Sequence, residues 1–314
     1  MNHEPRTMSQ KQSTCHLLMI RPVNFGFNEQ TAESNAFQNR NAQSGDANKQ
    51  AQKEFDGMVT TLRQNGVDVT VVDDTMEPHT PDSIFPNNWV SFHSDGQVFL
   101  YPMQAENRRL ERREDIINGL EDCFKVKHVI DLSRFEEANK FLEGTGSMVL
   151  DRENKIAYAC ISPRTDREVL GVFCKQADYT TITFDADDEK GQAIYHTNVL
   201  MCIGSGFATI CLDSIPNPHE KLVVKDSLLS THKEIIDISF DQMNHFAGNM
   251  LEVKNKSGET LIVMSKNAHD ALLEDQKTVL KKYGQLVYAD INTIETIGGG
   301  SARCMMAEVH LPLN

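Results

Sequence analysis

The sequence predicts an α/β fold in which five ββαβ units close into one ring. Three observations support this: short paired strands recur along the chain, a helical pattern and a further strand follow them, and the first and last strands are left to pair with each other. The paired strands begin near residues 88, 147, 197, 249 and 302, and a spacing of about 50 to 60 residues is typical of repeated units. The alternative is an ordinary mixed α/β domain with accidental spacing.

The paired strands are short apolar runs separated by turn residues such as Ser94-Asp95-Gly96 and Gly204-Ser205-Gly206. The last run has no such neighbour, so its natural partner is the run at 16–22. The predicted pairs are 89–93 with 97–103, 147–151 with 155–162, 197–203 with 207–213, 249–255 with 260–265, and 302–309 with 16–22.

Two segments between these strands carry an apolar stripe at helical spacing. The segment 46–66 has its stripe at Ala51, Phe55, Met58, Val59 and Leu62, and Gly66 supplies the stop. The segment 166–177 has its stripe at Val169, Leu170, Phe173 and Ala177. Each is followed by a strand, at 67–73 and 180–185.

Charge and cysteine usage narrow the class of protein. The 314 residues carry a net charge of −14, which disfavours binding to nucleic acid or to an anionic membrane. The seven cysteines include no CxxC pair, so neither a disulfide framework nor a zinc knuckle is indicated. No apolar run is long enough to span a membrane, and the start lacks the apolar core of a signal peptide. We expect a cytoplasmic protein with a disordered leader at 1–15 and a single domain at 16–314.

In a pseudo-symmetric ring, equivalent positions of the units converge on the central axis. Asn88, Glu143, His196, Asn249 and Cys304 all lie at or just before the first strand of their pairs. A cysteine thiolate is a nucleophile, a histidine can move its protons, and a carboxylate can orient the imidazole. We therefore predict that Cys304, His196 and Glu143 are catalytic. For a cysteine or histidine taken alone, ordinary packing is the alternative.

Two arginines are candidates for binding a substrate carboxylate, which arginine can hold with two parallel hydrogen bonds. Arg164 lies between the second strand pair and its helix, and Arg109 lies in the run 106–115 after the first pair. The neighbouring Arg108 is an alternative to Arg109, and a solvated helical face explains most of that run.

The stretch 81–93 contains the only tryptophan, Trp89, which we expect to pack in the core. Asp82, Asn87 and Asn88 precede it. They are either turn residues or substrate ligands at the mouth of the ring.

These segments resemble the arginine deiminase and amidinotransferase superfamily of guanidine-modifying pentein enzymes, over nearly the whole chain from about His16. The stretch GGGSARCMM resembles its nucleophile segment, LEGTGSMVLD its glutamate segment, HTNV its histidine segment, PDSIFPNN its guanidine-binding segment and SPRT its carboxylate-binding arginine motif. The stretch at 21–38, with FPNNWVS and YHTN, looks closest to the citrulline-utilisation hydrolase type. The resemblance implies a five-bladed α/β propeller (the pentein fold), a cysteine nucleophile and no cofactor.

The sequence departs from the arginine-cleaving members at three places. Asn88 and Asn198 stand where those members have aspartates, and Asn87 replaces an acid found in the dimethylarginine hydrolases. An amide both donates and accepts, as a neutral ureido group does, whereas a buried aspartate facing a neutral ligand would stay unpaired. We therefore expect citrulline to be the substrate, bound by Asn87, Asn88, Asn198 and Asp82 with Arg164 and Arg109.

Two other functions stay open. The first is the same chemistry on arginine or another guanidino compound. The second is a non-catalytic pentein binding module, which the presence of the cysteine and the histidine disfavours. For any of these enzymes the expected partner is a small amino-acid substrate, with a homo-oligomer possible and no metal.

Overall fold

The structure is a computed structural model that describes residues 11–42 and 45–314. Residues 1–10 of the expected leader lie outside this part. The described remainder packs against the rest of the chain, because the Gln12 side-chain amide donates to the carbonyls of Leu150 and Ile203, and Ser13 donates to Glu252.

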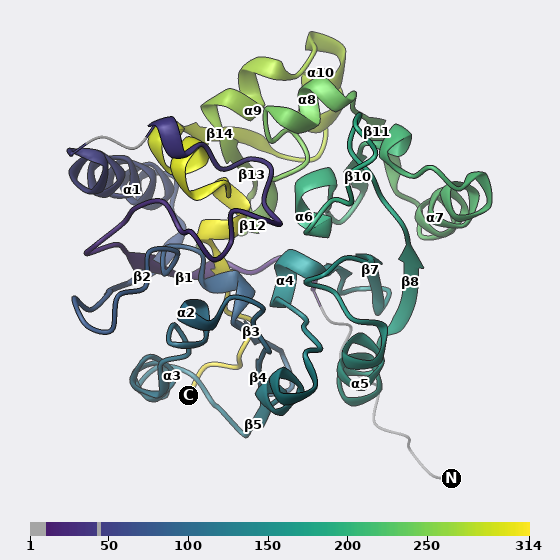
Figure 1. Ribbon diagram of the computed structural model, residues 1–314. Helices are drawn as coiled ribbons and strands as arrows, with labels where there is room; N and C mark the ends of the chain where they lie inside the picture. Colours follow the sequence, from purple (N-terminus) through teal and green to yellow (C-terminus); the bar gives the residue numbers. More distant parts are fainter. Residues whose placement is uncertain (1–10, 43–44) are drawn as a thin grey trace, which may run out of the picture.

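Five three-stranded sheets form the described part of the chain, and all have the same topology (Figure 1). In each sheet the central strand pairs antiparallel with one neighbour and parallel with the other. The sheets are β15 (Ala307–Glu308) with β1 (His16–Arg21) and β2 (Asp68–Asp73); β3 (Val90–Phe92), β4 (Gln97–Leu100) and β5 (His128–Asp131); β6 (Val149–Asp151), β7 (Ile156–Cys160) and β8 (Thr180–Phe184); β9 (Met201–Ile203), β10 (Phe207–Ile210) and β11 (Glu234–Asp237); and β12 (Leu251–Lys254), β13 (Thr260–Ser265) and β14 (Gln285–Ala289).

This topology confirms the five predicted strand pairs, including the pair made by the two ends of the sequence. Leu17 is opposite Glu308 and Leu18 is opposite Ala307 in the antiparallel ladder between β1 and β15. β15 contacts β3, β6 contacts β9 and β9 contacts β12, while α4, just before β6, contacts β3, and β13 contacts the segment before β15. The five units therefore follow one another around a common centre, as Figure 1 shows.

Helices connect the central strand of each sheet to its parallel neighbour. The predicted apolar stripes are buried in α1 (Ala47–Gln64) and α5 (Arg167–Ala177). Asp166 caps α5 by accepting from the backbone N–H groups of Glu168 and Val169. The other helices with this connecting place are α2 (Glu106–Arg109), α3 (Glu114–Leu120), α7 (Pro218–Ser230), α9 (Lys266–Ala271) and α10 (Glu274–Lys281), with the 3-10 turns η1 (Arg40–Ala42) and η4 (Leu212–Ser214). Three further helical segments lead from one sheet to the next: η3 (Ser133–Ala138), α8 (Phe240–Asn244) and the π-helical η5 (Ile294–Gly298).

The strand starts differ from the sequence prediction in a way that matters for the site. In four units a single helical turn occupies residues that were expected at the beginning of the first strand or just before it. These turns are η2 (Pro86–Asn88), α4 (Gly144–Ser147), α6 (Thr197–Leu200) and η6 (Ala302–Met305). All of their residues are buried, so the turns lie inside the ring.

None of the helices in the described residues has both the length and the apolar character needed to cross a membrane.

Candidate active site

The four buried turns carry the predicted catalytic and amide residues. Glu143 and His196 are the residues that immediately precede α4 and α6, Asn88 ends η2, and Cys304 lies within η6. Turns α4 and α6 contact each other, and so do η2 and α4 and η2 and η6. Repetition of the unit thus brings side chains far apart in sequence to one centre.

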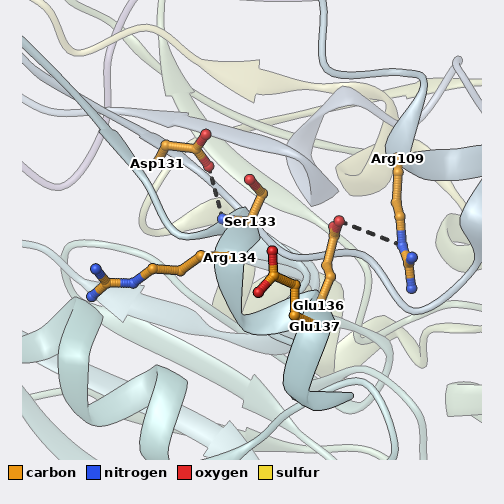
Figure 2. Close-up of a pocket in the computed structure, with 6 residues that line it drawn as sticks. All are labelled: Arg109, Asp131, Ser133, Arg134, Glu136 and Glu137. Atoms are coloured by element: carbon orange, nitrogen blue, oxygen red, sulfur yellow. Dashed lines mark hydrogen bonds and ion pairs between the residues drawn. The ribbon is translucent and has the colours of Figure 1, made fainter.

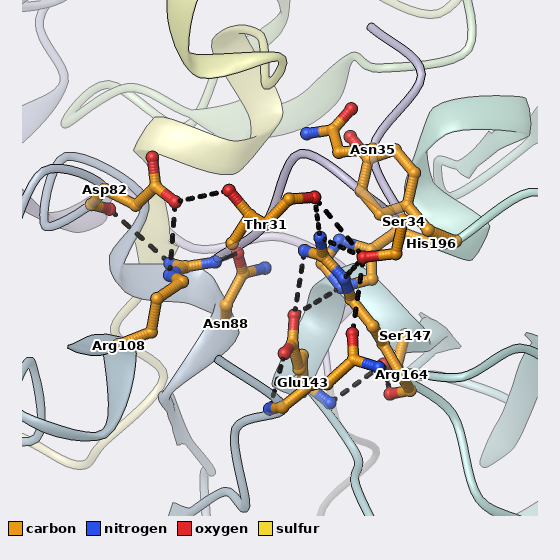
Figure 3. A network of polar contacts seen from close by, with 12 residues as sticks. Thr31, Ser34, Asn35, Asp82, Asn88, Arg108, Glu143, Ser147, Arg164 and His196 are labelled. Atoms are coloured by element: carbon orange, nitrogen blue, oxygen red, sulfur yellow. Dashed lines mark hydrogen bonds and ion pairs between the residues drawn. The ribbon is translucent and has the colours of Figure 1, made fainter. Parts of the chain in front are cut away.

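Glu143 and His196 form a buried hydrogen-bonded pair. His196 Nε2 lies 2.8 Å from Glu143 Oε2, and the two residues are 3% and 0% exposed. The second oxygen, Oε1, accepts from the backbone N–H of Gln104 at 3.0 Å. Arg164 Nη1 lies 3.4 Å from Oε2, so the carboxylate stands between an imidazole and a guanidinium (Figure 3).

The charges of this pair follow from its surroundings. Burial alone would raise the pKa of Glu143, but Arg164 and His196 outweigh burial and hold that pKa below its ordinary value. Burial lowers the pKa of His196 to about 4, against the opposing effect of Glu143 and with a further contribution from Arg164. At neutral pH the carboxylate is charged and the ring is neutral. Because the carboxylate can only accept, Nε2 carries the proton and Nδ1 has a lone pair.

Gly146 allows the imidazole of His196 to approach Asn88. A Cβ atom at this position would lie 2.4 Å from Asn88 Nδ2 and 2.8 Å from His196 Nδ1. No side chain fits there without displacing one of the two, so the glycine of the GTGS turn is required by close packing. Asn88 and His196 are consequently neighbours across the α-carbon of Gly146.

Two asparagines hold the thiol of Cys304. Asn198 Nδ2 and Asn249 Nδ2 lie 3.4 Å and 3.3 Å from Cys304 Sγ, and all three side chains are buried. Asn249 Oδ1 also accepts from the backbone N–H of Arg303, which fixes the turn that carries the cysteine. Asn198 Oδ1 is buried and has no hydrogen-bond partner among the described residues. Asn198 follows His196 by two residues, so the contact between Asn198 and Cys304 connects the turn that carries Cys304 with the turn that follows His196.

The amide of Asn88 is bonded on both sides. Its oxygen accepts from Arg108 Nη1 at 2.8 Å, and its nitrogen donates to Asn87 Oδ1 at 3.1 Å. Asn87 donates in turn to Thr145. An aspartate at position 88 would therefore face the Arg108 guanidinium. This corrects the sequence argument that such an aspartate would stay unpaired.

Asp82 lies on the far side of Arg108, 3.9 Å from its Nε, and accepts from Asn28 and Thr31. Burial raises the pKa of Asp82, although Arg108 opposes this effect. Its Oδ1 atom is buried and has no hydrogen-bond partner among the residues described.

The polar segment between β1 and α1 covers the cluster. Arg164 donates to the Thr31 carbonyl and to the Ser34 hydroxyl (Figure 3). Asn28 and Thr31 reach Asp82 from the same segment. Tyr195, the residue before His196, lies beneath the Arg164 guanidinium at 4.9 Å.

The structure does not bring Arg109 to this cluster. Its guanidinium donates to the carbonyls of Met103 and Gln104 and lies 3.5 Å from Glu136. It borders a separate pocket of about 470 Å³ with Asp131, Ser133, Arg134, Glu136 and Glu137 (Figure 2). Arg108, the neighbouring alternative, is the arginine that reaches Asn88.

Several residues of the cluster were not singled out from the sequence. Asn28, Thr31 and Ser34 lie in a polar segment without periodicity, which gives no signal. Asn249 was visible only as the equivalent position of the fourth unit. Among the described residues, no group of three or more histidine, cysteine or acidic side chains is placed to hold a metal ion.

The fold and the family match place the chain among the pentein-fold hydrolases of guanidino C–N bonds, and the superfamily resemblance is confirmed. A family model described as "N,N dimethylarginine dimethylhydrolase, eukaryotic" matches residues 21–311, and the chain belongs to this family. A comparison with curated protein sequences gave no match.

Solved structures share the fold at low identity. The N-terminal domain of an ArgZ variant, covalently bound to a reaction intermediate, is 18% identical with a TM-score of 0.73, covering 95% of this chain and 98% of that domain. Full-length ArgZ, an arginine dihydrolase from the ornithine-ammonia cycle in cyanobacteria, is 17% identical with a TM-score of 0.73, and only 41% of it is covered. A dimethylarginine dimethylaminohydrolase variant, as an adduct with S-methyl-L-thiocitrulline, is 15% identical with a TM-score of 0.63, covering 95% of this chain and 99% of that one.

Proposed function

We propose that the protein is a cysteine-dependent hydrolase of the ureido group of citrulline, of the citrulline-utilisation type. Residues 16–314 would form one catalytic domain, a five-bladed pseudo-symmetric propeller. The observation that carries the proposal is the amide character of the reacting end: Asn198 and Asn249 contact Cys304, and Asn88 lies beside His196. Glu143 is already engaged by His196 and Arg164, so it is poorly placed to neutralise a guanidinium as well.

The chemistry follows from the protonation states. As Cys304 Sγ attacks the ureido carbon, neutral His196 takes the thiol proton and Glu143 stabilises the imidazolium that forms. The imidazolium then gives the proton to the nitrogen whose C–N bond breaks, which leaves a thioester-like intermediate on Cys304. His196 next takes a proton from water as it adds to this carbon. The C–S bond then breaks, and the proton returns to the Cys304 sulfur. The carbamic acid that is released breaks down to carbon dioxide and the remaining amine. Over the cycle, citrulline and one water give ornithine, ammonia and carbon dioxide.

The amino-acid end of the substrate needs one cationic and one anionic partner. Arg164 is the stronger candidate for the α-carboxylate, because its guanidinium is buried within the cluster and bonds to a covering segment that could yield its place to a ligand. Asp82, with one unpartnered oxygen, suits the α-ammonium group. Arg109 would have to leave Glu136 to take part, so we place it second to Arg164 in this role.

The relatives support the amino-acid part of this proposal. AgrE has been solved with L-arginine and, in another complex, with ornithine and NAD⁺. Citrulline shares the α-amino and α-carboxylate groups of both amino acids. The same relatives favour the second candidate function, hydrolysis of arginine, since ArgZ is an arginine dihydrolase.

One assay separates the two candidates. The purified protein is incubated with citrulline and with arginine, and ornithine and ammonia are measured to obtain kcat/KM for each. We expect citrulline to be preferred, and the double variant Asn88→Asp with Asn198→Asp to lose most citrulline turnover, because the carboxylates repel negative charge that develops on the ureido oxygen when its carbon is attacked. A parent protein that prefers arginine would replace the citrulline proposal with the arginine one. A cytoplasmic location and a homo-oligomer remain part of the proposal.

A further inference from the structure

We propose that Arg108 is a positioning residue that selects a neutral ureido group by fixing the orientation of the Asn88 amide. The inference rests on the proposed function and extends it to a residue that need not touch the substrate.

The guanidinium of Arg108 is held in one orientation. Its Nε and Nη2 atoms each lie 2.9 Å from an oxygen of Glu111, and Nη2 also approaches the Phe85 carbonyl at 3.3 Å. Arg108 and Glu111 are 2% and 3% exposed. This forked pairing leaves Nη1 pointing at Asn88, 2.8 Å from Oδ1.

A guanidinium has only hydrogen-bond donors, so it favours the orientation of a neighbouring amide in which the amide oxygen faces the guanidinium. With Oδ1 toward Arg108, the NH₂ group of Asn88 must face the other way. There it donates to Asn87 Oδ1 and lies against Gly146, beside the His196 ring. Figure 3 shows Asn88 between Arg108 and the Glu143 side of the cluster. The flipped amide would set its NH₂ group against the Arg108 donor and its oxygen against the Asn87 Oδ1 acceptor, and is therefore disfavoured.

Asn198 presents the opposite group. Its NH₂ is directed at Cys304, and its Oδ1 has no hydrogen-bond partner in the described part of the chain. The two amides thus offer one donor, from Asn88, and one acceptor, from Asn198. A ureido group complements this pair, because it has a carbonyl oxygen and NH groups. A guanidinium has NH groups alone, so one of them would meet the NH₂ of Asn88.

Direct binding of the substrate carboxylate by Arg108 is the main competing role. All three nitrogens of Arg108 already have acceptors, which are Glu111, Asn88 and the Phe85 carbonyl. A carboxylate could reach the guanidinium only by displacing one of them. The two roles predict different responses to ornithine, which has the α-carboxylate but no ureido group.

The test is a double-mutant cycle between Asn88 and Arg108. Arg108→Met alone would leave the buried Glu111 carboxylate without a counter-charge. It is therefore combined with Glu111→Leu, and this combination is called the paired variant. The parent, Asn88→Ala, the paired variant and their combination are compared by kcat/KM for citrulline and arginine, by the ornithine inhibition constant and by Tm. A matched control replaces another buried ion pair, Lys233→Met with Asp151→Leu.

We expect the paired variant to lose at least about tenfold in kcat/KM for citrulline, with a smaller loss for arginine, because a free amide can rotate. Asn88→Ala should lose a similar amount, and the combination should lose no more than Asn88→Ala alone. The ornithine inhibition constant should stay within about twofold of the parent. The control pair should leave the citrulline-to-arginine ratio unchanged, whatever its Tm.

Additive losses, an unchanged substrate ratio, or ornithine binding that weakens in step with citrulline turnover would each overturn the role of Arg108 alone. Failure of the proposed function is visible earlier, in the parent. A parent that prefers arginine, or that releases ornithine from neither compound, overturns both.

Discussion

The Nε2 atom of His196 and the Oε2 atom of Glu143 lie 2.8 Å apart, and Arg164 stands 3.4 Å from the same oxygen. The carboxylate therefore contacts a permanent guanidinium and, in the proposed mechanism, an imidazole that becomes an imidazolium during catalysis. For the proposed catalysis, the negative charge of Glu143 should therefore matter more than the size of its side chain or its ability to accept a hydrogen bond.

Replacing Glu143 by glutamine tests that charge. Glu143→Gln keeps the size of the side chain but cannot stabilise the imidazolium, so kcat should fall at least about a hundredfold with a smaller change in KM. Steady-state ornithine release measures both constants. Glu252→Gln is a suitable control, since Glu252 is also buried but bonds to Ser13 and Ser205. Equal effects of the two changes would remove Glu143 from the mechanism.

Cys304→Ser should abolish turnover while Tm changes little, because the hydroxyl is a much weaker nucleophile of similar size. Cys202→Ser is the comparison. Burial raises the pKa of the Cys202 thiol to about 12, so it stays protonated and inert. Substantial activity in Cys304→Ser would mean that the nucleophile lies elsewhere.

Gly146→Ala should damage the site far more than its single methyl group suggests. The new atom would meet Asn88 Nδ2 and His196 Nδ1 at less than ordinary contact distance, so activity should fall by more than about tenfold. Gly171 lies within α5 and has nothing within 4 Å of its added Cβ, so Gly171→Ala should leave activity intact and stabilise the helix by about 0.5–1 kcal/mol. Activity assays and thermal unfolding distinguish these outcomes, and a fully active Gly146→Ala would show that the approach of Asn88 and His196 is not needed.

His310 predicts a pH effect that does not involve the active site. Burial, with help from Arg152 and against Glu308, lowers its pKa to about 4 from an ordinary 6.5. As the pH falls, the unfolded chain therefore binds a proton at this histidine before the folded protein does. The free energy of unfolding is thus unaffected by His310 above pH 6.5 and decreases between pH 6.5 and pH 4. His310→Gln should therefore gain stability relative to the parent between pH 6.5 and 4, by an amount on the order of a few kcal/mol. Urea unfolding across this range measures the difference, and parallel curves would contradict the prediction.

The strand pairs could be predicted because their signal is local. Short apolar runs on both sides of a turn such as Gly204-Ser205-Gly206 define a hairpin without reference to the rest of the chain. The pairing of β1 with β15 followed by exclusion, since each was the only apolar strand left without a neighbour. Both inferences depend on burial of the strands, and β1 is buried on both faces, with Leu17 and Met19 in one apolar cluster and Leu18 and Ile20 in another.

The turns that hold the site could not be predicted in the same way. A single helical turn such as α4 or α6 is too short for a periodic pattern, and its conformation depends on contacts with other turns. The sequence could not decide between Arg108 and Arg109 for a related reason. Adjacent residues of a helix point about 100° apart, and four residues of α2 do not reveal from sequence which face is buried.

The pairing of β15 with β1 also bears on when the proposed activity can arise. Cys304 lies in the turn directly before β15, and β15 pairs with a strand from the opposite end of the described residues. On refolding, Glu143 can therefore meet His196 before the turn that carries Cys304 is held in place. We expect catalytic activity on refolding to appear with the slowest, sequence-distant pairing step and not with the bulk of the secondary structure.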